Sequence, residues 1–314
     1  MIKKNDKIFI AGHNGMIGSA ILKKFKKNGY KNILTVDKKE LDLRNQNDVF
    51  NFFKRKKPKA TIIAAAKVGG IYANDRYKAD FIFDNLSIQN NLIHGSFKSK
   101  IKNLIFLGSS CIYPKNSPQP IKESYLLKGP LEHTNESYAI AKIAGLKMCE
   151  SYNIQHGTNY KCLMPANSYG PGDNYNTYGS HFFPANIKKL FFLGQNKKKK
   201  ALIWGTGKVK RELIFSEDVA DACLYFLNKK IREPILNIGT GRDMTIKQYI
   251  QFIAKKLNLD LEIRFDHSKP DGMPRKVLDV SLAKKYGWIA KTSLSDGFDK
   301  TFEDFQKNIN KLRS

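Results

Sequence analysis

The sequence has few acidic residues, few cysteines and no long apolar run, and each shortage argues against a class of protein. Only 28 of its 314 residues are Asp or Glu, against 55 Lys or Arg. The four cysteines show neither CxxC spacing nor histidines at metal-ligand intervals, which argues against a zinc site and a disulfide framework. No stretch reaches the roughly 18 apolar residues of a membrane helix, and the first apolar segment is too short for a signal peptide. We therefore expect a cytoplasmic protein with reduced thiols, no metal and no membrane partner.

The excess of basic residues gives a formal net charge of +27, which raises the question of a nucleic-acid partner. Clustering decides the question, because clustered cations release counterions from phosphates. Lysines are spread along the whole chain, and only Lys197–Lys200 forms a run. We predict a solvated basic surface that binds no nucleic acid, although the charge suits small anionic ligands.

Short apolar runs alternate with amphipathic segments over much of the chain. The expected strands are Ile8–Ala11, Ile33–Val36, Thr61–Ala66, Leu104–Leu107, Lys161–Met164 and, after a break, Pro234–Ile238. The expected helices are Met16–Asn28, Gln46–Lys56, Asp84–Lys98 and Tyr138–His156. Continuous apolar strands separated by helices are typical of a parallel sheet covered on both faces. The sequence thus predicts an α/β fold, a Rossmann-type doubly wound parallel sheet.

Two parts are expected within this fold. We predict that residues 1–168 form the dinucleotide-binding part and that residues 208–240 return to its sheet. Residues 169–207 and 241–314 have a mixed, loop-rich character. They are expected to form a smaller α+β lobe that binds the substrate.

A glycine-rich turn follows the first expected strand. It runs from Gly12 to Gly18 with the spacing G-x-x-G-x-x-G, and a helix follows at once. In such a turn, backbone N–H groups and the helix dipole meet a pyrophosphate without side chains in the way. The preceding strand, the following helix and an acidic residue after the second strand together predict dinucleotide binding.

The residues after the second strand leave the choice of coenzyme open. Asp37 favours NAD, because a carboxylate there binds a free ribose hydroxyl. Lys38 and Lys39 favour NADP, because a base there accommodates the 2′-phosphate. No arginine is available for that role.

Two further motifs indicate a reaction at a carbonyl group. Tyr138 and Lys142 are spaced i, i+4, so they share one helix face. An ammonium beside the phenol is expected to lower the phenol pKa from about 10, so that the tyrosine passes a proton to a carbonyl oxygen while hydride reaches the carbon. Ser109 follows the fourth expected strand, where ligands of open α/β sheets bind. It can hydrogen-bond the same carbonyl.

Five strings resemble the GDP-L-fucose synthases, which belong to the extended short-chain dehydrogenase/reductase family. They are AGHNGMIGSA (11–20), AAAKVGGI (64–71), GSSCIYP (108–114), YAIAKIAG (138–145) and KPDGMPRK (269–276). The resemblance implies an enzyme that inverts C3 and C5 of GDP-4-keto-6-deoxy-D-mannose and then reduces C4 with NADPH. It also implies a homodimer that pairs the helices Asp84–Lys98 and Tyr138–His156 of each subunit.

The resemblance assigns roles to individual residues. Cys111 is the implied base and His181 the implied acid for the inversions, while Ser109, Tyr138 and Lys142 carry the reduction. The implied substrate residues are Lys189, Trp204, Arg211 and Asp271, with Arg275 and Lys276 nearby. The coenzyme residues are expected to be Gly12, Asn14, Gly15, Met16, Ile17, Gly18, Asp37, Lys38, Asp42, Leu43, Ala65, Leu107, Gly108, Ser109, Lys142, Pro165, Asn167, Ser168 and His181.

The sequence departs from the family at three positions, and rival functions stay open. Asn14 stands where many relatives have a basic residue, Lys38 where an arginine is common, and Phe215 where a histidine is usual. The nearest rivals are enzymes for GDP-colitose or for a GDP-linked heptose. A redox-neutral, NAD-dependent sugar-nucleotide epimerase or dehydratase is another, and a binding protein without turnover is the last.

Overall fold

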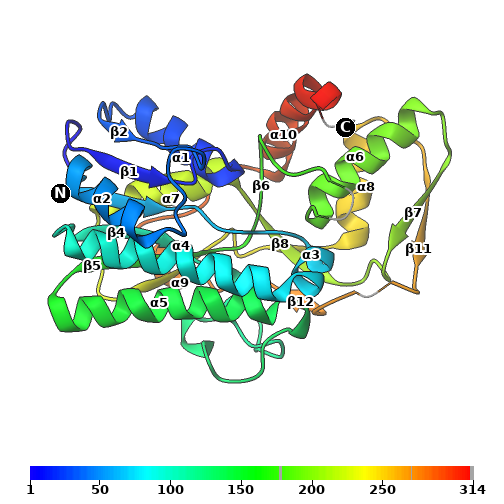
Figure 1. The fold of residues 1–314 in the computed structure, drawn as a ribbon. Coiled ribbons are helices and arrows are strands. Elements are labelled where there is room, and N and C mark those ends of the chain that lie inside the picture. Colours follow the sequence, from blue (N-terminus) through cyan, green and yellow to red (C-terminus); the bar gives the residue numbers. More distant parts are fainter. Residues whose placement is uncertain (177–178, 270, 312–314) are drawn as a thin grey trace.

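Six parallel strands form the central sheet of the computed structural model, which describes residues 1–176, 179–269 and 271–311. In spatial order they are β2 (Ile33–Leu34), β1 (Ile8–Ala11), β3 (Ala60–Ile63), β4 (Asn103–Leu107), β5 (Asn159–Pro165) and β9 (Ile235–Ile238) (Figure 1). Ile8 of β1 pairs with Ile33 on one side and Ala60 on the other, so the strand order changes direction at β1. Open parallel sheets bind ligands at such a switch point, beyond the carboxyl ends of the strands.

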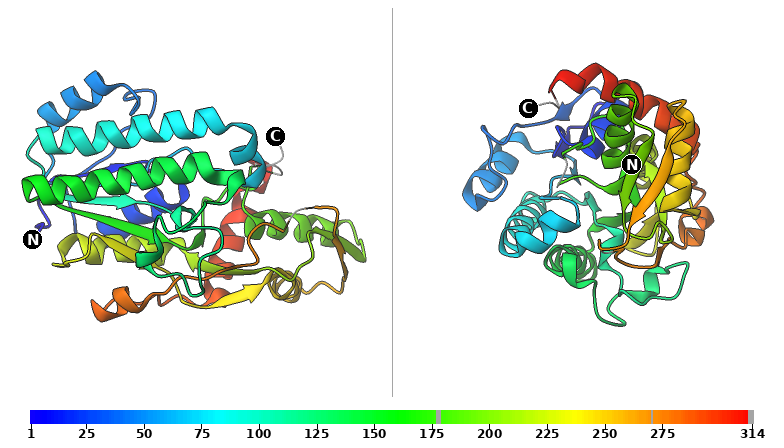
Figure 2. Two further views of the ribbon diagram at one scale, coloured as in Figure 1. Left: turned by 90° about the horizontal axis from the view of Figure 1, so that it is seen from below. Right: turned by 90° about the vertical axis from the view of Figure 1, so that its right-hand side faces the viewer.

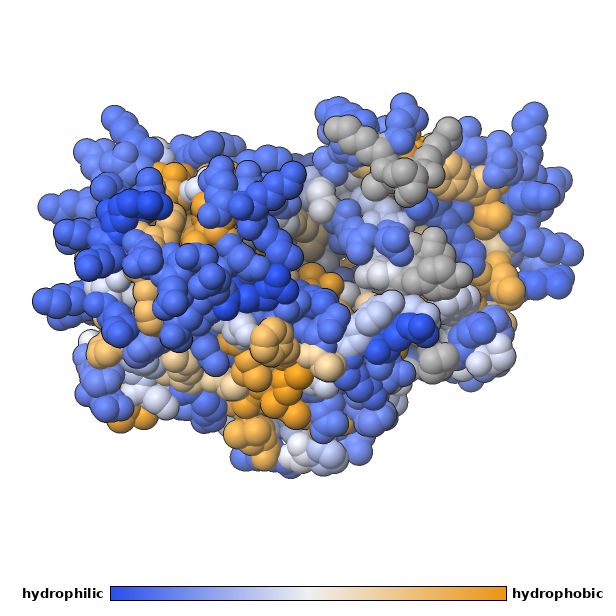
Figure 3. Space-filling view, in the orientation of Figure 1, coloured by the Kyte–Doolittle hydropathy of each residue, from blue (hydrophilic) through white to orange (hydrophobic). Residues whose placement is uncertain are grey.

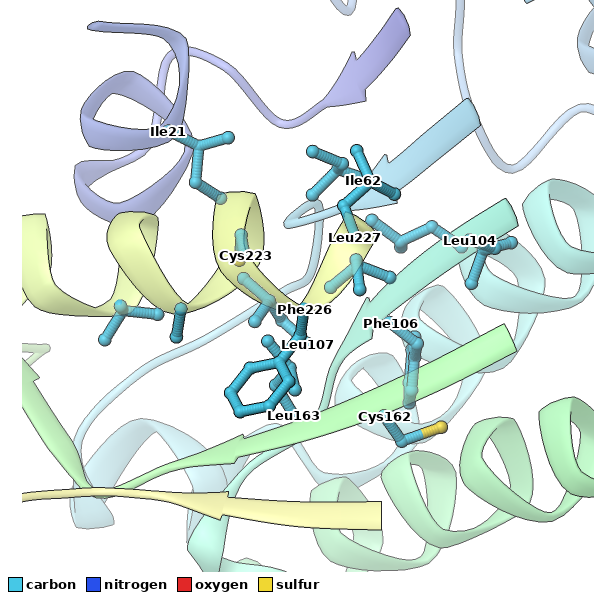
Figure 4. Packing of buried hydrophobic residues seen from close by; sticks show 14 of the residues in the cluster. Ile21, Ile62, Leu104, Phe106, Leu107, Cys162, Leu163, Cys223, Phe226 and Leu227 are labelled. Atoms are coloured by element: carbon cyan, nitrogen blue, oxygen red, sulfur yellow. The ribbon is translucent and has the colours of Figure 1, made fainter. Parts of the chain in front are cut away.

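Helices cover both faces of this sheet. On one face α1 (Met16–Lys27) packs against α7 (Ser216–Asn228). On the other, α4 (Lys78–Lys98) lies between α2 (Gln46–Lys56) and α5 (Glu136–His156) (Figure 2). Figure 4 shows how Cys223, Phe226 and Leu227 of α7 pack onto the buried side chains of β4 and β5. The four cysteines are all buried free thiols, in line with the expected reduced state.

Local sequence explains where the helices begin and end. The Asn45 side chain caps α2 by accepting a hydrogen bond from the Asp48 N–H. Val49, Phe52 and Phe53 of that helix are buried. The helix α5 ends at Gly157, whose backbone is left-handed, with φ 61°.

A second part of the chain has its own sheets and core. There β8 (Lys210–Phe215) pairs with β6 (Asn167–Tyr169), β10 (Asp243–Thr245) and β12 (Arg275–Lys276), and β7 (Lys200–Trp204) pairs with β11 (Glu262–Asp266). Three helices contribute buried side chains to its core: α6 (Phe182–Gln195), α8 (Ile246–Lys256) and α10 (Leu294–Asn308). The shorter helical segments are α3 (Ile71–Arg76), α9 (Ser281–Lys285), η1 (Ser110–Ile112), η2 (Glu123–Tyr125), η3 (His133–Asn135) and η4 (Ile309–Lys311).

The predicted Rossmann-type fold is confirmed, and the structure changes some of its bounds. The second strand ends at Leu34 rather than Val36, and the third at Ile63 rather than Ala66. The division of the chain into two predicted parts stays a prediction. In the structure β8 pairs outside the six-stranded sheet, and Leu278, Val280, Ala283 and Trp288 contribute to the core of the first part.

The carboxylate of Glu212 in β8 links three segments that are distant in the sequence. Its side chain is 2% exposed. One carboxylate oxygen accepts hydrogen bonds from the backbone N–H groups of Thr240 and Gly241, at 2.5 and 2.7 Å. The other accepts from the N–H of Leu278 at 2.8 Å. Burial raises the pKa of this carboxyl to about 6, so it is ionised at neutral pH.

We expect Glu212→Ala to lower the free energy of unfolding by about 3 kcal/mol, because it leaves several buried N–H groups without an acceptor. Glu212→Gln should cost less, since its amide oxygen can still accept two of these bonds. Urea unfolding measures both. Glu217→Ala is the control, because the Glu217 side chain is half exposed in its ion pair with Lys300. A loss for Glu212→Ala no larger than that of the control would contradict the anchoring role.

Candidate active site

The glycine-rich turn between β1 and α1 is shaped by two glycines. Gly12 has φ +88°, and a Cβ there would lie 2.6 Å from the backbone N of Ala65. A Cβ on Gly18 would lie 1.9 Å from the carbonyl oxygen of Gly12. Gly15, the residue before α1, forms no side-chain cap, and the first turn of the helix holds no acidic residue. The turn therefore fits the pyrophosphate of a dinucleotide, which the N–H groups at the start of α1 would hold.

The other residues predicted for the coenzyme follow the carboxyl ends of neighbouring strands. Ala65 lies just beyond β3, Leu107 and Pro165 end β4 and β5, and Asn167 and Ser168 belong to β6. Ala65, Leu107 and Pro165 thus lie at the carboxyl edge of the sheet, where the glycine-rich turn also lies. The surface is hollowed near the centre of Figure 3, where the first part meets the second.

Asp37 and Asp42, the two acidic residues predicted to contact the coenzyme, have different surroundings. Asp37 lies three residues beyond β2, and its Oδ1 accepts a hydrogen bond from Asn14 at 2.6 Å. Asp42 is bound by the guanidinium of Arg44, and these hydrogen bonds lower the pKa of its carboxyl to about 2. Arg44 also contacts Asp84 at 3.1 Å. Arg44 therefore competes for a carboxylate that is predicted to contact the coenzyme.

Ser109 and Cys111 lie together where β4 leads into η1. The backbone N–H of Cys111 donates to the Ser109 hydroxyl at 3.3 Å, and its thiol lies 3.0 Å from the same oxygen. Cys111 is 8% exposed. A Cβ on Gly108 would overlap the side chain of Met164, so glycine lets β4 lie close to β5 there.

Tyr138 and Lys142 reach the same place from α5. The Lys142 ammonium is 3% exposed and donates to the carbonyl oxygen of Leu107 at 2.9 Å. Its nitrogen lies 5.8 Å from the centroid of the Tyr138 ring. Gly145 allows this approach, since a Cβ there would lie 2.7 Å from the Phe106 ring. The structure thus brings the predicted Ser109, Cys111, Tyr138 and Lys142 together.

The pKa of Tyr138 differs from the expectation. Burial raises it above the usual value and the charge of Cys111 adds to this rise, while a hydrogen bond with Ser109 lowers it. Burial also lowers the pKa of Lys142 to about 8. The expected lowering of the phenol pKa by Lys142 is not seen: the ammonium bonds to the Leu107 carbonyl, and the effect of burial on Tyr138 exceeds that of its hydrogen bond with Ser109. Tyr138 is therefore a protonated phenol at neutral pH, which suits a proton donor.

The position of His181 depends on a contact between distant segments. His181 precedes α6, and the residues before it dock on the turn after β3, where the Gly70 N–H donates to the Gly179 carbonyl at 3.0 Å. A Cβ on Gly70 would lie 2.6 Å from the Ser180 carbonyl oxygen. The imidazole keeps solvent access, yet crowding by protein atoms lowers its pKa, and the charge of Lys276 lowers it further.

Lys276 was predicted only to lie near the residues that bind the nucleotide, yet the structure links it to the catalytic residues. Burial lowers its pKa, while the charges of Cys111 and Glu132 raise it and that of Arg211 lowers it. Because Lys276 also acts on His181, it interacts electrostatically with both residues implied as base and acid. In the sequence, only its position at the end of the string KPDGMPRK indicates a role in the site. Pro270 of that string lies outside the described residues.

The residues implied for the nucleotide gather in the second part. Trp204 ends β7 with 56% of its surface exposed, and the Lys269 ammonium lies 5.7 Å from its ring centroid. The Lys189 ammonium donates to the carbonyl of Leu202, two residues before that tryptophan. An exposed indole with cations around it can stack on a planar base and attract phosphates.

Arg211 and Asp271 form a connected pair beside this tryptophan. The Arg211 guanidinium donates to the carbonyls of Met273 and Asp271, at 2.6 and 3.3 Å. The Asp271 carboxylate is occupied by the backbone N–H and hydroxyl of Thr206, at 2.8 and 2.7 Å. Asp271 therefore orders the turn after β7 in this structure.

No helix within residues 1–176, 179–269 and 271–311 combines the length and apolar character needed to cross a membrane. In the same residues, no three His, Cys, Asp or Glu side chains gather where they could hold a metal ion.

A coenzyme turn at the switch point and a Ser, Tyr and Lys set at the end of β4 define a nicotinamide-dependent enzyme acting on a carbonyl. The chain belongs to the NAD dependent epimerase/dehydratase family, whose model matches residues 8–239. Within it, GDP-L-fucose synthase 1 of Arabidopsis thaliana is 46% identical over 98% of this chain and 96% of that protein.

Solved structures point to the same group. A GDP-6-OMe-4-keto-L-xylo-heptose reductase from C. jejuni has a TM-score of 0.91 and 36% identity, covering 98% of this chain and 99% of that one. A GDP-L-fucose synthetase from Naegleria fowleri bound to NADP has a TM-score of 0.90 and 26% identity, covering 100% of this chain and 96% of that one.

Proposed function

We propose that the protein converts GDP-4-keto-6-deoxy-D-mannose to GDP-L-fucose by inverting C3 and C5 and then reducing C4. The observation that carries this is the placement of Cys111 and Ser109 within 3.0 Å of each other at the site of Tyr138. A redox-neutral epimerase needs no separate base beside its tyrosine. The full-length identity of 46% to a GDP-L-fucose synthase supports the substrate.

The inversions use the acidity of the carbons next to the ketone. Cys111 removes a proton from one face of the sugar ring, and His181 returns a proton to the opposite face. The enolate oxygen accepts hydrogen bonds from Ser109 and Tyr138, which hold it between the two steps. Lys276 keeps a positive charge beside the developing anion.

Reduction follows at the same carbonyl. Tyr138 donates its phenolic proton to the C4 oxygen, and NADPH held at the glycine-rich turn would supply the hydride to C4. Lys142 holds the end of β4 through the Leu107 carbonyl and keeps a positive charge near the phenol. Trp204, Lys189 and Arg211 bind the GDP moiety.

The direct test mixes the purified protein with GDP-4-keto-6-deoxy-D-mannose and NADPH in D₂O. We expect loss of the reduced nicotinamide absorbance and, by NMR, GDP-L-fucose labelled at C3 and C5. Consumption of NADPH with label at neither carbon would exclude the epimerase half. Absence of NADPH consumption would exclude this substrate.

A second candidate function is the reduction of a GDP-linked keto-heptose. It is favoured by the TM-score of 0.91 to a heptose reductase, which slightly exceeds the 0.90 to the fucose synthetase. The two substrates differ in the length of the chain at C5. Comparing kcat/KM for both in one assay decides between them, and a preference for the heptose would replace the first proposal.

The position of His181 gives a prediction for Gly70. We expect Gly70→Ala to lower deuterium incorporation at C3 and C5 by about tenfold or more, because its Cβ would displace the Ser180 carbonyl and with it the acid. NADPH binding should stay unchanged. In Gly129→Ala, the control, the Cβ makes an ordinary contact at 3.4 Å. Wild-type incorporation in Gly70→Ala would show that the contact does not position His181.

The same proposal includes a cytoplasmic homodimer. Apolar side chains gather over α4 and α5 in Figure 3. Phe83 of α4 and Ile140 of α5 are 66% and 43% exposed, and Tyr72 and Tyr77 lie near them in the chain at 51% and 49%. An exposed apolar face of this kind is suited to a second copy. Sedimentation equilibrium distinguishes one chain from two.

A further inference from the structure

One face of the helix α10 lies along β6 and the loop that follows it (Figure 1). A Cβ on Gly297 would overlap the hydroxyl of Tyr169, the last residue of β6. Further along α10, the carbonyl of Thr301 accepts a hydrogen bond from the Tyr175 hydroxyl at 3.4 Å, and the ring centroids of Phe305 and Tyr175 lie 4.8 Å apart. The three α10 residues are spaced four apart, so they share one helix face. This face supports the loop.

The same loop, residues 170–175, reaches the start of α1. Gly172 has φ +78°, and a Cβ there would lie 3.9 Å from the Cα of Met16, the first residue of that helix. The N–H groups at the start of α1 would hold the pyrophosphate of the coenzyme. The loop therefore borders the place where the pyrophosphate would bind.

Asp304 of α10 attaches the loop at this point. Its Oδ2 accepts a hydrogen bond from the backbone N–H of Gly172 at 2.8 Å, although the two residues are 132 positions apart. Its Oδ1 accepts from the Asn308 amide at 3.3 Å. A carboxylate binds an N–H more strongly than a neutral acceptor does. Asp304 thus fixes the backbone of Gly172 beside the first turn of α1.

We propose that Asp304 positions the loop at residues 170–175 for NADPH, so that α10 of the second part completes the coenzyme site. The inference rests on the coenzyme site of the proposed function and deepens it. The family model matches residues 8–239, and none of the residues predicted for the coenzyme comes from α10. Asp304 acts through Gly172 and is a positioning residue.

The charge of Asp304 separates two ways in which it could affect the coenzyme. A carboxylate near a pyrophosphate repels it, so removing the charge alone should tighten NADPH binding. Losing the hydrogen bond should weaken binding, because the freed loop must then be ordered when the coenzyme binds. Asp304→Ala removes both the charge and the acceptor. Asp304→Asn removes the charge and keeps an oxygen that can accept from the Gly172 N–H.

The test titrates the full chain with NADPH in the absence of any sugar, following nicotinamide fluorescence. In Asp304→Ala we expect the dissociation constant to rise by about tenfold, as loss of one hydrogen bond to a charged acceptor implies. In Asp304→Asn it should stay within about threefold of the wild type or fall. Glu303→Ala is the matched control, because the exposed Glu303 carboxylate of the same helix pairs with Lys307 and its loss should leave the dissociation constant unchanged.

Two further measurements separate positioning from a general loss of structure. Calorimetric titration with GDP should give the wild-type dissociation constant in Asp304→Ala, because the residues proposed to bind GDP belong to other elements. Hydrogen–deuterium exchange of the wild type serves if Asp304→Ala folds poorly. NADPH should then slow exchange both in residues 170–175 and in the second half of α10.

Tighter or unchanged NADPH binding in Asp304→Ala would overturn the proposal, and so would a loss of equal size in Asp304→Asn. An exchange pattern in which NADPH leaves α10 unaffected would also overturn it. These outcomes are separate from the sugar assay. A chain that shows the expected coenzyme effects but turns over no GDP sugar refutes the proposed function alone, and one that does not bind NADPH refutes both.

Discussion

Replacing Tyr138 with Phe is expected to slow reduction of the keto sugar by about 10²- to 10⁴-fold, because the variant lacks the phenol that protonates the C4 oxygen. The structure holds this phenol as a proton donor, since burial raises its pKa above the ordinary value. NADPH oxidation with saturating substrate measures the loss, and fluorescence titration should show unchanged coenzyme binding. Deuterium incorporation at C3 and C5 should fall less, because Ser109 still contacts the enolate oxygen.

Tyr125→Phe serves as the control, since it removes a hydroxyl from a half-buried tyrosine outside the site. The pH profile adds a further check. Reduction should decline as pH rises through about 8, where the buried Lys142 loses its charge, whereas Tyr138 stays protonated over that range. A Tyr138→Phe variant that reduces within threefold of wild type would remove the tyrosine from the mechanism.

The parts of the site that sequence could predict are local in the chain. The turn at Gly12 lies between a strand and a helix, and the i, i+4 spacing of Tyr138 and Lys142 places both on one helix face. Such patterns need no knowledge of tertiary contacts. Cys111 and His181 have no comparable pattern, and they were found only through resemblance to a family.

The features that sequence could not predict depend on contacts between distant residues. Gly70 meets the carbonyl of Ser180, and Lys276 acts on Cys111 and His181, although nothing in the intervening sequence marks either contact. The predicted lowering of the Tyr138 pKa is wrong for the same reason. The spacing reveals the neighbouring ammonium, whereas burial, which has the larger effect, depends on the packing of α5 against β4.

Cys111→Ser separates the two halves of the reaction. We expect deuterium incorporation at C3 and C5 to fall by about 10²- to 10⁴-fold, because a hydroxyl is far too weak an acid to serve as the proton-accepting anion at neutral pH. The serine can still donate to Ser109, as the thiol does at 3.0 Å, so the geometry around the ketone should persist. NADPH oxidation should therefore continue and give a reduced sugar whose C3 and C5 keep their original configuration.

The control is Cys149→Ser, because that thiol is fully buried in α5 and burial raises its pKa, which makes it unfit as a base. Any fall in its activity would report packing rather than proton transfer, and urea unfolding would reveal it. If Cys111→Ser lost incorporation at one carbon and kept it at the other, a second base would have to act there, and His181→Asn would be examined for the same pattern. Equal loss of epimerisation and reduction in Cys111→Ser would mean that the thiol supports the ketone site as a whole, and its assignment as the base would fail.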